Sequence, residues 1–599
     1  MLRSTTLGVH ALARQAPSHV ARDAGKNIAR RLHSSRPPRT THSLASDATT
    51  AAQNPFRKTA NSNRRIALAA SAAVLAGGAL LASSGSSDDT PLIPAHLNPN
   101  DPLSALDPSV LARTTSHLTA ADLSDLVRQW VVYAISEQSM LVEMGPWMLG
   151  KLQWANDNIP LLGPAVWAVF AFGMDHTFYK VFVGGESVPG CAETVKQYAE
   201  RGIGVMLNYS AEAPLGSAKS GGGIDQAALN EITTAVAEAA RLAPSPAPSA
   251  PASSIKPSLL AIKLSGLIYD ASILARASTA LTSSTTVARG GRLPSSIPFP
   301  DSPELTAEDH ELLDKLYDGL RKVASEARTH GVRLLVDAEQ SWFQPAIDRF
   351  CDLLSEEFNR VDSPSAAPIV YNTYQCYRRD TPDKIAAALE HADANGYAFG
   401  AKLVRGAYQE SERKRHQGTP AFEAGEPCVV WDSKAETDKC YDECAALLEK
   451  RLVENLKKEG SSAGVGVCLA SHNGTSMKRF LEALREDGLA KEKDGGLEVD
   501  ERLRGRVAFG QLMGMSDNLT ITLVNLLRPP PSSADPSLLP LVVKYTPYAN
   551  LEQGLPYLIR RANENQSILK GDPTSGRGGA REERRAVAKE IRRRMGLAF

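Results

Sequence analysis

The sequence predicts an α/β fold in which eight parallel strands alternate with helices. Short apolar runs end in polar residues, and most of them precede a stretch with helical periodicity. The chain is 43% hydrophobic over 599 residues, which is enough to bury a sizeable core. Eight alternations favour a closed (β/α)8 barrel, although a doubly wound open sheet would show the same pattern.

The predicted strands are rich in Val, Leu and Ile, as parallel strands buried on both faces should be. In chain order they are Gly202–Glu212, Leu260–Leu264, Val332–Glu339, Pro368–Gln375, Ala398–Tyr408, Gly464–Asn473, Arg506–Met515 and Leu538–Tyr548. Helical periodicity fits Glu308–His330, Lys384–Asn395, Thr437–Lys457, Thr475–Asp487 and Leu551–Leu569. A further helical region, Ala120–Arg201, precedes the first strand.

Three stretches interrupt this pattern because their composition disfavours regular structure. Ala243–Ser258 alternates Pro, Ala and Ser, Ser278–Pro303 is polar with Gly and Pro, and Pro529–Pro540 contains three consecutive prolines. We expect the first two to extend into solvent. The tail Gly571–Phe599 is Gly-rich and then strongly basic, and we expect it to lie outside the core.

The amino-terminal part of the chain predicts targeting rather than folding. Residues 1–45 contain frequent Ser and Thr and only one acid, Asp23, among the basic residues Arg3, Arg14, Arg22, Lys26, Arg30, Arg31, Arg36 and Arg39. This composition is typical of a mitochondrial transit peptide, with a basic disordered tail as the alternative. Residues 46–115 are predicted as a linker. Its uncharged run Ile66–Ala82 is either a marginal membrane span or a hydrophobic linker.

The remaining predicted domain boundaries are a helical arm at 116–201, the barrel at 202–570 and a basic tail at 571–599.

With 67 basic and 67 acidic residues, the charge balance gives no reason to expect nucleic acid as a partner. The seven cysteines are scattered, which favours free thiols and no metal site. No dinucleotide-binding GxGxxG or P-loop motif stands between a strand and a helix.

Polar residues gather where the predicted strands end. In a (β/α)8 barrel these ends meet at one mouth, where catalysis takes place. A single such residue is usually a helix cap or a solvated loop residue, but a set of them indicates a site. The residues that reach this mouth are Lys263, Asp337, Glu339, Gln375, Lys402, Arg405, Tyr408, His472, Asn473 and Tyr545, together with the apolar Leu512.

The last predicted helix carries a second polar group. Tyr557, Arg560, Arg561 and Glu564 follow one another at helical spacing and share most of one face. Two arginines offer forked donors that match a carboxylate. The alternative is an ordinary solvated helix face.

Six motifs in order resemble those of the proline dehydrogenase family. They are DAE at Asp337–Glu339, YNTYQCY at Tyr371–Tyr377, KLVRGAY at Lys402–Tyr408, FGQLMGM at Phe509–Met515, KYTP at Lys544–Pro547 and LPYLIRRANEN at Leu555–Asn565. The resemblance extends from about Thr177 to Leu569. It implies a distorted (β/α)8 TIM-like barrel that binds FAD without a covalent bond and oxidises L-proline to Δ1-pyrroline-5-carboxylate. It also implies ubiquinone as electron acceptor and a place on the matrix side of the mitochondrial inner membrane.

The resemblance further implies residue roles. Arg560 and Arg561 would pair with the proline carboxylate, while Lys263 and Asp337 would lie in the substrate pocket. The proline ring would pack against Tyr408, Leu512, Tyr545 and Tyr557. The cofactor side would include Gln375, Lys402, Gly406, His472, Asn473 and Gln511, and Glu564 would support the arginines. Two alternatives stay open: a hydroxyproline dehydrogenase, and a catalytically inactive barrel that acts as a membrane scaffold.

Overall fold

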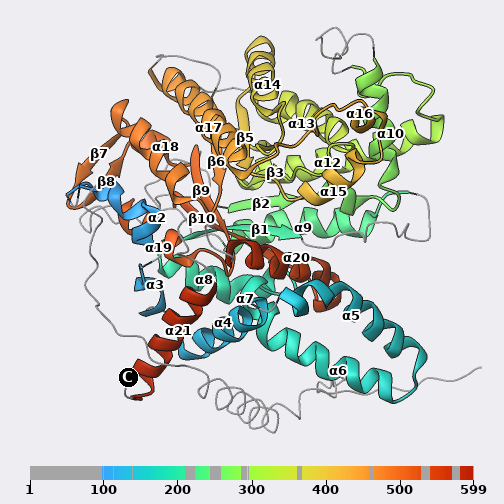
Figure 1. Ribbon diagram of the computed structural model, residues 1–599. Helices are drawn as coiled ribbons and strands as arrows, with labels where there is room; N and C mark the ends of the chain where they lie inside the picture. The colour runs from blue at the N-terminus through green and yellow to red at the C-terminus, as the bar shows by residue number, and fades with distance from the viewer. Residues whose placement is uncertain are drawn as a thin grey trace, which may run out of the picture. The chain divides into compact units, whose positions relative to one another are not determined.

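Eight parallel strands form a closed barrel in the computed structural model (Figure 1). The structure describes residues 97–597, apart from 99, 112, 120, 138, 210–222, 243–257, 285–292, 294–295, 361–366, 458–463, 528–539 and 570–579. The barrel strands are β1 (Gly204–Tyr209), β2 (Ser258–Ile262), β3 (Arg333–Val336), β4 (Val370–Gln375), β5 (Phe399–Val404), β6 (Val465–Ala470), β9 (Val507–Leu512) and β10 (Val542–Tyr548). Each pairs with its neighbours in chain order, and β10 closes the ring against β1. The predicted fold class is therefore confirmed, and each predicted apolar run overlaps a strand.

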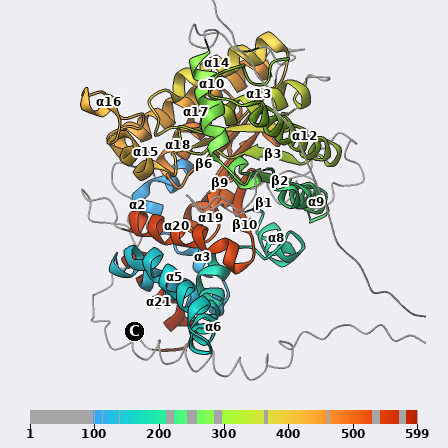
Figure 2. The ribbon, with the colours of Figure 1, turned by 90° about the vertical axis from the view of Figure 1, so that its right-hand side faces the viewer.

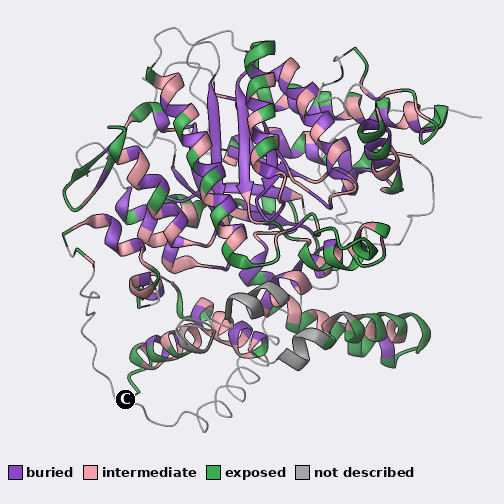
Figure 3. Cartoon of the chain, turned by 45° about the horizontal axis from the view of Figure 1, so that its top comes forward, coloured by how far each residue is buried: buried purple, intermediate pink, exposed green. Residues whose placement is uncertain are grey.

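The barrel interior is filled by side chains from seven of its strands. Buried residues that form this cluster are Met206, Leu259, Ala261, Leu335, Tyr371, Cys468, Ala508 and Val543. The strands are buried on both faces because helices cover their outer side, as the buried colouring in Figure 3 shows. Continuous Val and Leu runs are therefore the expected strand sequence.

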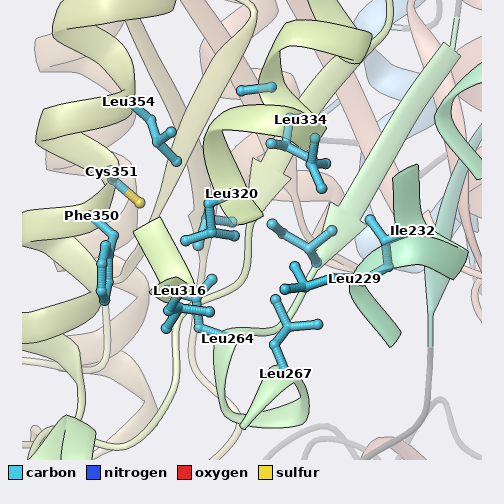
Figure 4. Packing of buried hydrophobic residues seen from close by; sticks show 14 of the residues in the cluster. Leu229, Ile232, Leu264, Leu267, Leu316, Leu320, Leu334, Phe350, Cys351 and Leu354 are labelled. Atoms are coloured by element: carbon cyan, nitrogen blue, oxygen red, sulfur yellow. The ribbon is translucent and has the colours of Figure 1, made fainter. Parts of the chain in front are cut away.

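The helices that cover the barrel follow the strands in the chain. They are α9 (Gln226–Leu242), α10 (Ser272–Ser283), α12 (Ala307–His330), α13 (Gln344–Phe358), α14 (Thr381–Asn395), α15 (Gln409–His416), α16 (Pro420–Glu423), α17 (Lys434–Lys457), α18 (Gly474–Glu486) and α19 (Asp517–Leu526). Figure 4 shows one of the packed layers, in which Leu229 and Ile232 of α9 meet Leu316 and Leu320 of α12. A small hairpin, β7 (Ala490–Lys493) and β8 (Gly496–Val499), precedes β9.

Local sequence signals explain where α12 begins and ends. Thr306 accepts a hydrogen bond from the Asp309 amide, and the Asp309 side chain accepts one from the Thr306 amide, which forms a capping box. Gly331 then ends the helix in the left-handed conformation at φ 66°. The predicted helix Glu308–His330 matches these bounds within one residue.

An arm of helices precedes β1, as predicted. Its elements are α3 (Ser116–Thr119), α4 (Leu123–Ser136), α5 (Ser139–Asn158), α6 (Leu162–Met174), η3 (Asp175–Tyr179), α7 (Lys180–Phe182), η4 (Pro189–Cys191) and α8 (Ala192–Glu200). The last barrel helix, α20 (Leu551–Leu569), packs against this arm. Figures 1 and 2 show α20 between the barrel and α5.

Three expectations need correction. Residues 97–115 are not a plain linker, because η2 (Pro102–Leu106) and α2 (Pro108–Leu111) place Leu103, Leu106 and Leu111 in the core beside α18 and α19. The polar stretch that begins at Ser278 is helical through Ser283, since α10 buries Ser278 and Leu281. The tail is not wholly outside the core.

The tail residues Ala580–Arg594 form helix α21, which packs on α4. Val587 and Ile591 are buried with Leu118 and Leu126. Arg594 donates to the main-chain oxygens of Leu118 and Ala121 at 2.7 and 2.6 Å. Because the tail is mostly basic, its sequence did not indicate that Val587 and Ile591 would be buried against α4.

Other expectations lie outside the described residues. These are the transit peptide, the Ile66–Ala82 run, and all but the last residue of the stretches Ala243–Ser258 and Pro529–Pro540. Within the described part of the chain, no helix is both long and apolar enough to cross a membrane.

Candidate active site

Three strands contribute one bonded cluster at the mouth of the barrel. Asp337 directly follows β3, Lys402 lies in β5 and Tyr545 lies in β10. The Lys402 ammonium forms an ion pair with one carboxylate oxygen of Asp337, and the Tyr545 hydroxyl donates to the other at 2.8 Å. The Lys402 Nζ also lies 5.3 Å from the centre of the Tyr545 ring. Since Lys402 is only 4% exposed, its charge needs this carboxylate.

A second group comes from the loops after β2, β3 and β5 and from Gln375, the last residue of β4. The Lys263 ammonium is 5.7 Å from the centre of the Tyr408 ring, a cation–π contact. The buried carboxylate of Glu339 accepts a hydrogen bond from the Ser265 amide at 2.9 Å. The main-chain oxygen of Glu339 accepts one from Gln375 Nε2 at 2.7 Å. Glu339 thus fixes the loop that follows Lys263 and orients the Gln375 side chain.

Arg405 supports the loop after β6. Its guanidinium donates to Asp438 at 2.6 Å and to the hydroxyls of Ser471 and Ser476, and it lies 4.3 Å from the centre of the Tyr441 ring. Ser471 precedes His472, so Arg405 holds the segment that carries the imidazole. The sequence placed Arg405 at a strand end but did not predict that it holds the loop that carries His472.

His472 is a neutral imidazole at the mouth. Burial, together with the nearby charges of Lys544, Arg561 and Arg405, lowers its pKa to about 3. Its Nδ1 atom is buried and has no hydrogen-bond partner in the described part of the protein. Such an atom costs free energy unless a bound group completes its hydrogen bond.

Three residues predicted on the cofactor side have structural contacts. Asn473 caps α18 by accepting from the Thr475 amide at 2.9 Å. Gln511 donates to the Ser471 oxygen at 3.4 Å and accepts from Thr520 at 3.1 Å. Gly406 has φ 121°, and a Cβ there would meet the Tyr377 ring at 2.5 Å. Their roles toward a cofactor stay predictions.

Helix α20 carries the predicted arginine pair. Arg561 is 4% exposed, and its guanidinium lies 4.9 Å from the centre of the Tyr557 ring. Tyr557 is buried with Met515 and packs near Leu512, at the end of β9. Arg560 is half-buried. The side chain of Glu564 lies outside the described residues, so its role stays a prediction.

Sequence reasoning missed the ion pair between the buried Lys544 and the partly exposed Asp517. Lys544 Nζ lies 2.7 Å from the Asp517 carboxylate and donates to the main-chain oxygen of Met515, also at 2.7 Å. Burial lowers the pKa of Lys544, while the lysine charge lowers the pKa of Asp517. The pair fixes the turn between β9 and α19. The KYTP motif was its only sequence signal.

Residues 191–571 match the family model described as Proline dehydrogenase. The chain belongs to the proline dehydrogenase family. It is 35% identical over 266 residues to "Proline dehydrogenase 1, mitochondrial" of Homo sapiens, a match that covers 44% of this chain and 38% of the human protein. It is 29% identical to "Proline dehydrogenase 2, mitochondrial" of Arabidopsis thaliana, over 84% of this chain and 94% of the plant protein. The resemblance found in the motifs is confirmed.

Two further comparisons bear on specificity and fold. "Hydroxyproline dehydrogenase" of Mus musculus is 34% identical over 49% of this chain and 54% of its own length. A crystal structure of proline utilization A from Bdellovibrio bacteriovorus superposes with a TM-score of 0.51 at 19% identity, over 81% of this chain and 44% of that chain. The chain thus spans less than half of the human relative and of this solved structure, and the structural likeness supports the fold alone.

Proposed function

We propose that this proline dehydrogenase family member oxidises L-proline to Δ1-pyrroline-5-carboxylate in mitochondria. The observation that carries the proposal is the bonded cluster of Asp337, Lys402 and Tyr545 at the barrel mouth, with Arg561 and Tyr557 buried on α20. Charged and aromatic groups that converge from strand ends suit a small zwitterion with an apolar ring.

Arg560 and Arg561 are the proposed carboxylate ligands. A guanidinium fork binds a carboxylate through two parallel hydrogen bonds and so fixes its orientation. The Tyr557 ring below the Arg561 guanidinium restricts where that fork can point. Tyr408, Leu512 and Tyr545 would enclose the methylene groups of the ring, and Lys263 and Asp337 would line the same pocket. Fixing the reacting carbon in this way lowers the barrier because orientation is established on binding.

The residues also fit a non-covalent FAD. The unpartnered Nδ1 of the neutral His472 and the buried Lys402 ammonium are suited to a polar, electron-accepting ring. When bound, FAD would accept two electrons from proline and pass them to ubiquinone. Lys402 would place a positive charge beside that ring, and Gln375, Gly406, Asn473 and Gln511 would shape the surrounding loops. The Tyr545 hydroxyl donates to Asp337 and so fixes the carboxylate, and the fixed carboxylate holds the Lys402 ammonium in position.

The proposed location is the matrix side of the inner membrane. The basic, Ser-rich first 45 residues support import, and the human and plant relatives are named as mitochondrial. A membrane quinone as acceptor would require the enzyme to work next to the bilayer.

Substituting Arg561 tests the carboxylate assignment. Loss of one partner of a buried ion pair costs about 3–5 kcal/mol. We therefore expect Arg561→Ala to raise the KM for L-proline at least about a hundredfold, since 1.36 kcal/mol is a factor of ten. The KM of Arg561→Lys should lie between those of the wild type and Arg561→Ala, because lysine keeps the positive charge but lacks the forked donors of the guanidinium. FAD content is the control and should not change. An unchanged KM in Arg561→Ala contradicts the assignment.

Steady-state rates with trans-4-hydroxy-L-proline separate this proposal from its alternatives. The Tyr545 hydroxyl is bonded to Asp337, so the ring cannot swing away freely to admit an added hydroxyl group. We expect a higher kcat/KM for L-proline. A preference for the hydroxylated substrate favours a hydroxyproline dehydrogenase, and purified protein without flavin favours an inactive scaffold.

A further inference from the structure

Helices α5 and α6 form a hairpin that belongs to none of the chemistry above. The two helices pack on each other over a short connection at Ile159–Leu161. At their tip Gly163 is buried, and a Cβ there would meet the Ala155 main-chain oxygen at 2.0 Å. Glycine therefore permits the close approach. Figure 3 shows that much of the surface of this hairpin is exposed.

The exposed surface of this hairpin is apolar. Leu161 is 90% exposed and Val169 is 75% exposed. Further exposed apolar side chains on the hairpin are Met144, Trp147, Met148, Trp154, Ile159, Leu162, Val166 and Phe172. Single exposed apolar residues are ordinary, but a contiguous group marks an interaction surface.

The composition of α6 fits a lipid partner. Leu162–Met174 contains no charged residue. Trp147 and Trp154 on α5 are exposed, and tryptophan is enriched where a bilayer meets water. Leu161 has φ 66°, an unfavourable conformation for leucine, which presents its side chain at the tip. A bilayer would bury the exposed apolar tip in hydrocarbon and place the indole rings of Trp147 and Trp154 at the lipid–water interface.

The length of α6 limits the depth of insertion. Its 13 residues extend about 20 Å, whereas the hydrocarbon core of a bilayer is about 30 Å thick. No helix in the described ranges is able to cross a membrane. The hairpin therefore fits insertion into one leaflet, in the manner of monotopic proteins.

A basic helix adds charge complementarity. Helix α21 has the sequence AREERRAVAKEIRRR, with seven basic and three acidic residues. Arg585, Lys589 and Arg593 are exposed. Both α21 and the hairpin contact α4 and α20, and Figures 1 and 2 show them on the same side of α20. Apolar insertion beside exposed lysine and arginine is the pattern of binding to anionic lipid.

We propose that the α5–α6 hairpin inserts into one leaflet of an anionic bilayer and docks the enzyme there. The inference deepens the membrane association proposed above and rests on it for the role of the quinone. Helix α5 contacts α20, which carries Arg560 and Arg561. Docking through the hairpin therefore places the substrate helix beside the bilayer, where a lipid-soluble quinone dissolves.

Vesicle flotation of the full chain tests this proposal. The probes are vesicles of phosphatidylcholine alone and of phosphatidylcholine with phosphatidylglycerol. The test variant is Leu161→Glu/Val169→Glu, and the matched control is Ile297→Glu/Phe422→Glu, whose apolar side chains are exposed outside the hairpin at 44% and 50%. All proteins keep residues 66–82, so any contribution of that run is constant. We expect the test variant to lose at least about tenfold in binding to anionic vesicles, because carboxylates enter hydrocarbon poorly.

The outcomes are distinct. Wild-type tryptophan emission should shift to shorter wavelength on anionic vesicles, since three of the six tryptophans lie on the hairpin, and the test variant should lose this shift. Equal flotation of both variants overturns the proposal. So does a wild-type dimer in solution that becomes monomeric in the test variant, which would assign the surface to a second copy. Proline oxidation with a soluble quinone should be unchanged in both variants. If the wild type does not oxidise proline with a soluble quinone, that result would instead contradict the proposed function.

Discussion

Replacing Asp337 with asparagine leaves the Lys402 ammonium buried without its carboxylate. The Lys402 side chain is 5% exposed and that of Asp337 is 14% exposed, so water does not readily take the place of the lost charge. Removing one partner of such a pair costs about 3–5 kcal/mol. The asparagine oxygen still accepts from the Tyr545 hydroxyl, which retains about 1 kcal/mol. We therefore expect Asp337→Asn to lower the free energy of unfolding by about 3 kcal/mol.

A double-mutant cycle isolates the pair. Lys402→Met removes the cation and keeps an apolar chain of similar length, so Asp337→Asn/Lys402→Met should be more stable than the sum of the single losses predicts by about 2 kcal/mol. Urea unfolding of the flavin-free protein at neutral pH, followed by circular dichroism, measures each free energy. The matched control is Glu311→Gln/Lys315→Met, an ion pair on α12 that is exposed at both ends and should show a coupling below about 0.5 kcal/mol.

Additive losses at Asp337 and Lys402 would refute this reasoning. They would mean that each side chain is solvated or has another partner, and that the mouth of the barrel is not organised around this pair.

Three further predictions concern separate parts of the fold. Gly406→Ala should lower the free energy of unfolding by at least about 2 kcal/mol, because its Cβ would meet Tyr377 at a positive φ; a loss below about 1 kcal/mol in urea unfolding contradicts this. Burial raises the pKa of Glu449 to about 7, so its ionisation destabilises the folded state as pH rises from about 4.5 to 7. Glu449→Gln should therefore raise Tm at pH 8 and leave it nearly unchanged at pH 4.5; equal shifts at both values would contradict this sign. Ile591→Asp should speed amide hydrogen exchange in α21 and α4 alone, since Ile591 is buried against α4; unchanged exchange there would show that the helix does not depend on this contact.

The strands could be predicted because their signal is local. Each run of Val, Leu and Ile is buried on both faces, so the residues alone indicate a strand, and the polar residue that follows marks the mouth. Asp337 directly follows β3 and Lys402 lies in β5, and the sequence placed both at that mouth without specifying their ion pair.

The missed features depend on partners distant in sequence. Val587 and Ile591 look like isolated apolar residues in a basic tail until α4 provides their contacts. Leu103 and Leu106 become core residues only because α18 and α19 lie beside them. Asn473 caps α18, a role that is common for a polar residue after a strand, whereas the family resemblance assigned it to the cofactor side.

Anaerobic mixing of the purified enzyme with L-proline tests the central claim most directly. If the arginines of α20 hold the amino acid against a flavin at the barrel mouth, the visible flavin absorbance should bleach with a proline-dependent rate, and Arg561→Ala should bleach only at much higher proline concentration. A flavin-loaded enzyme whose absorbance does not change at any proline concentration would contradict the account.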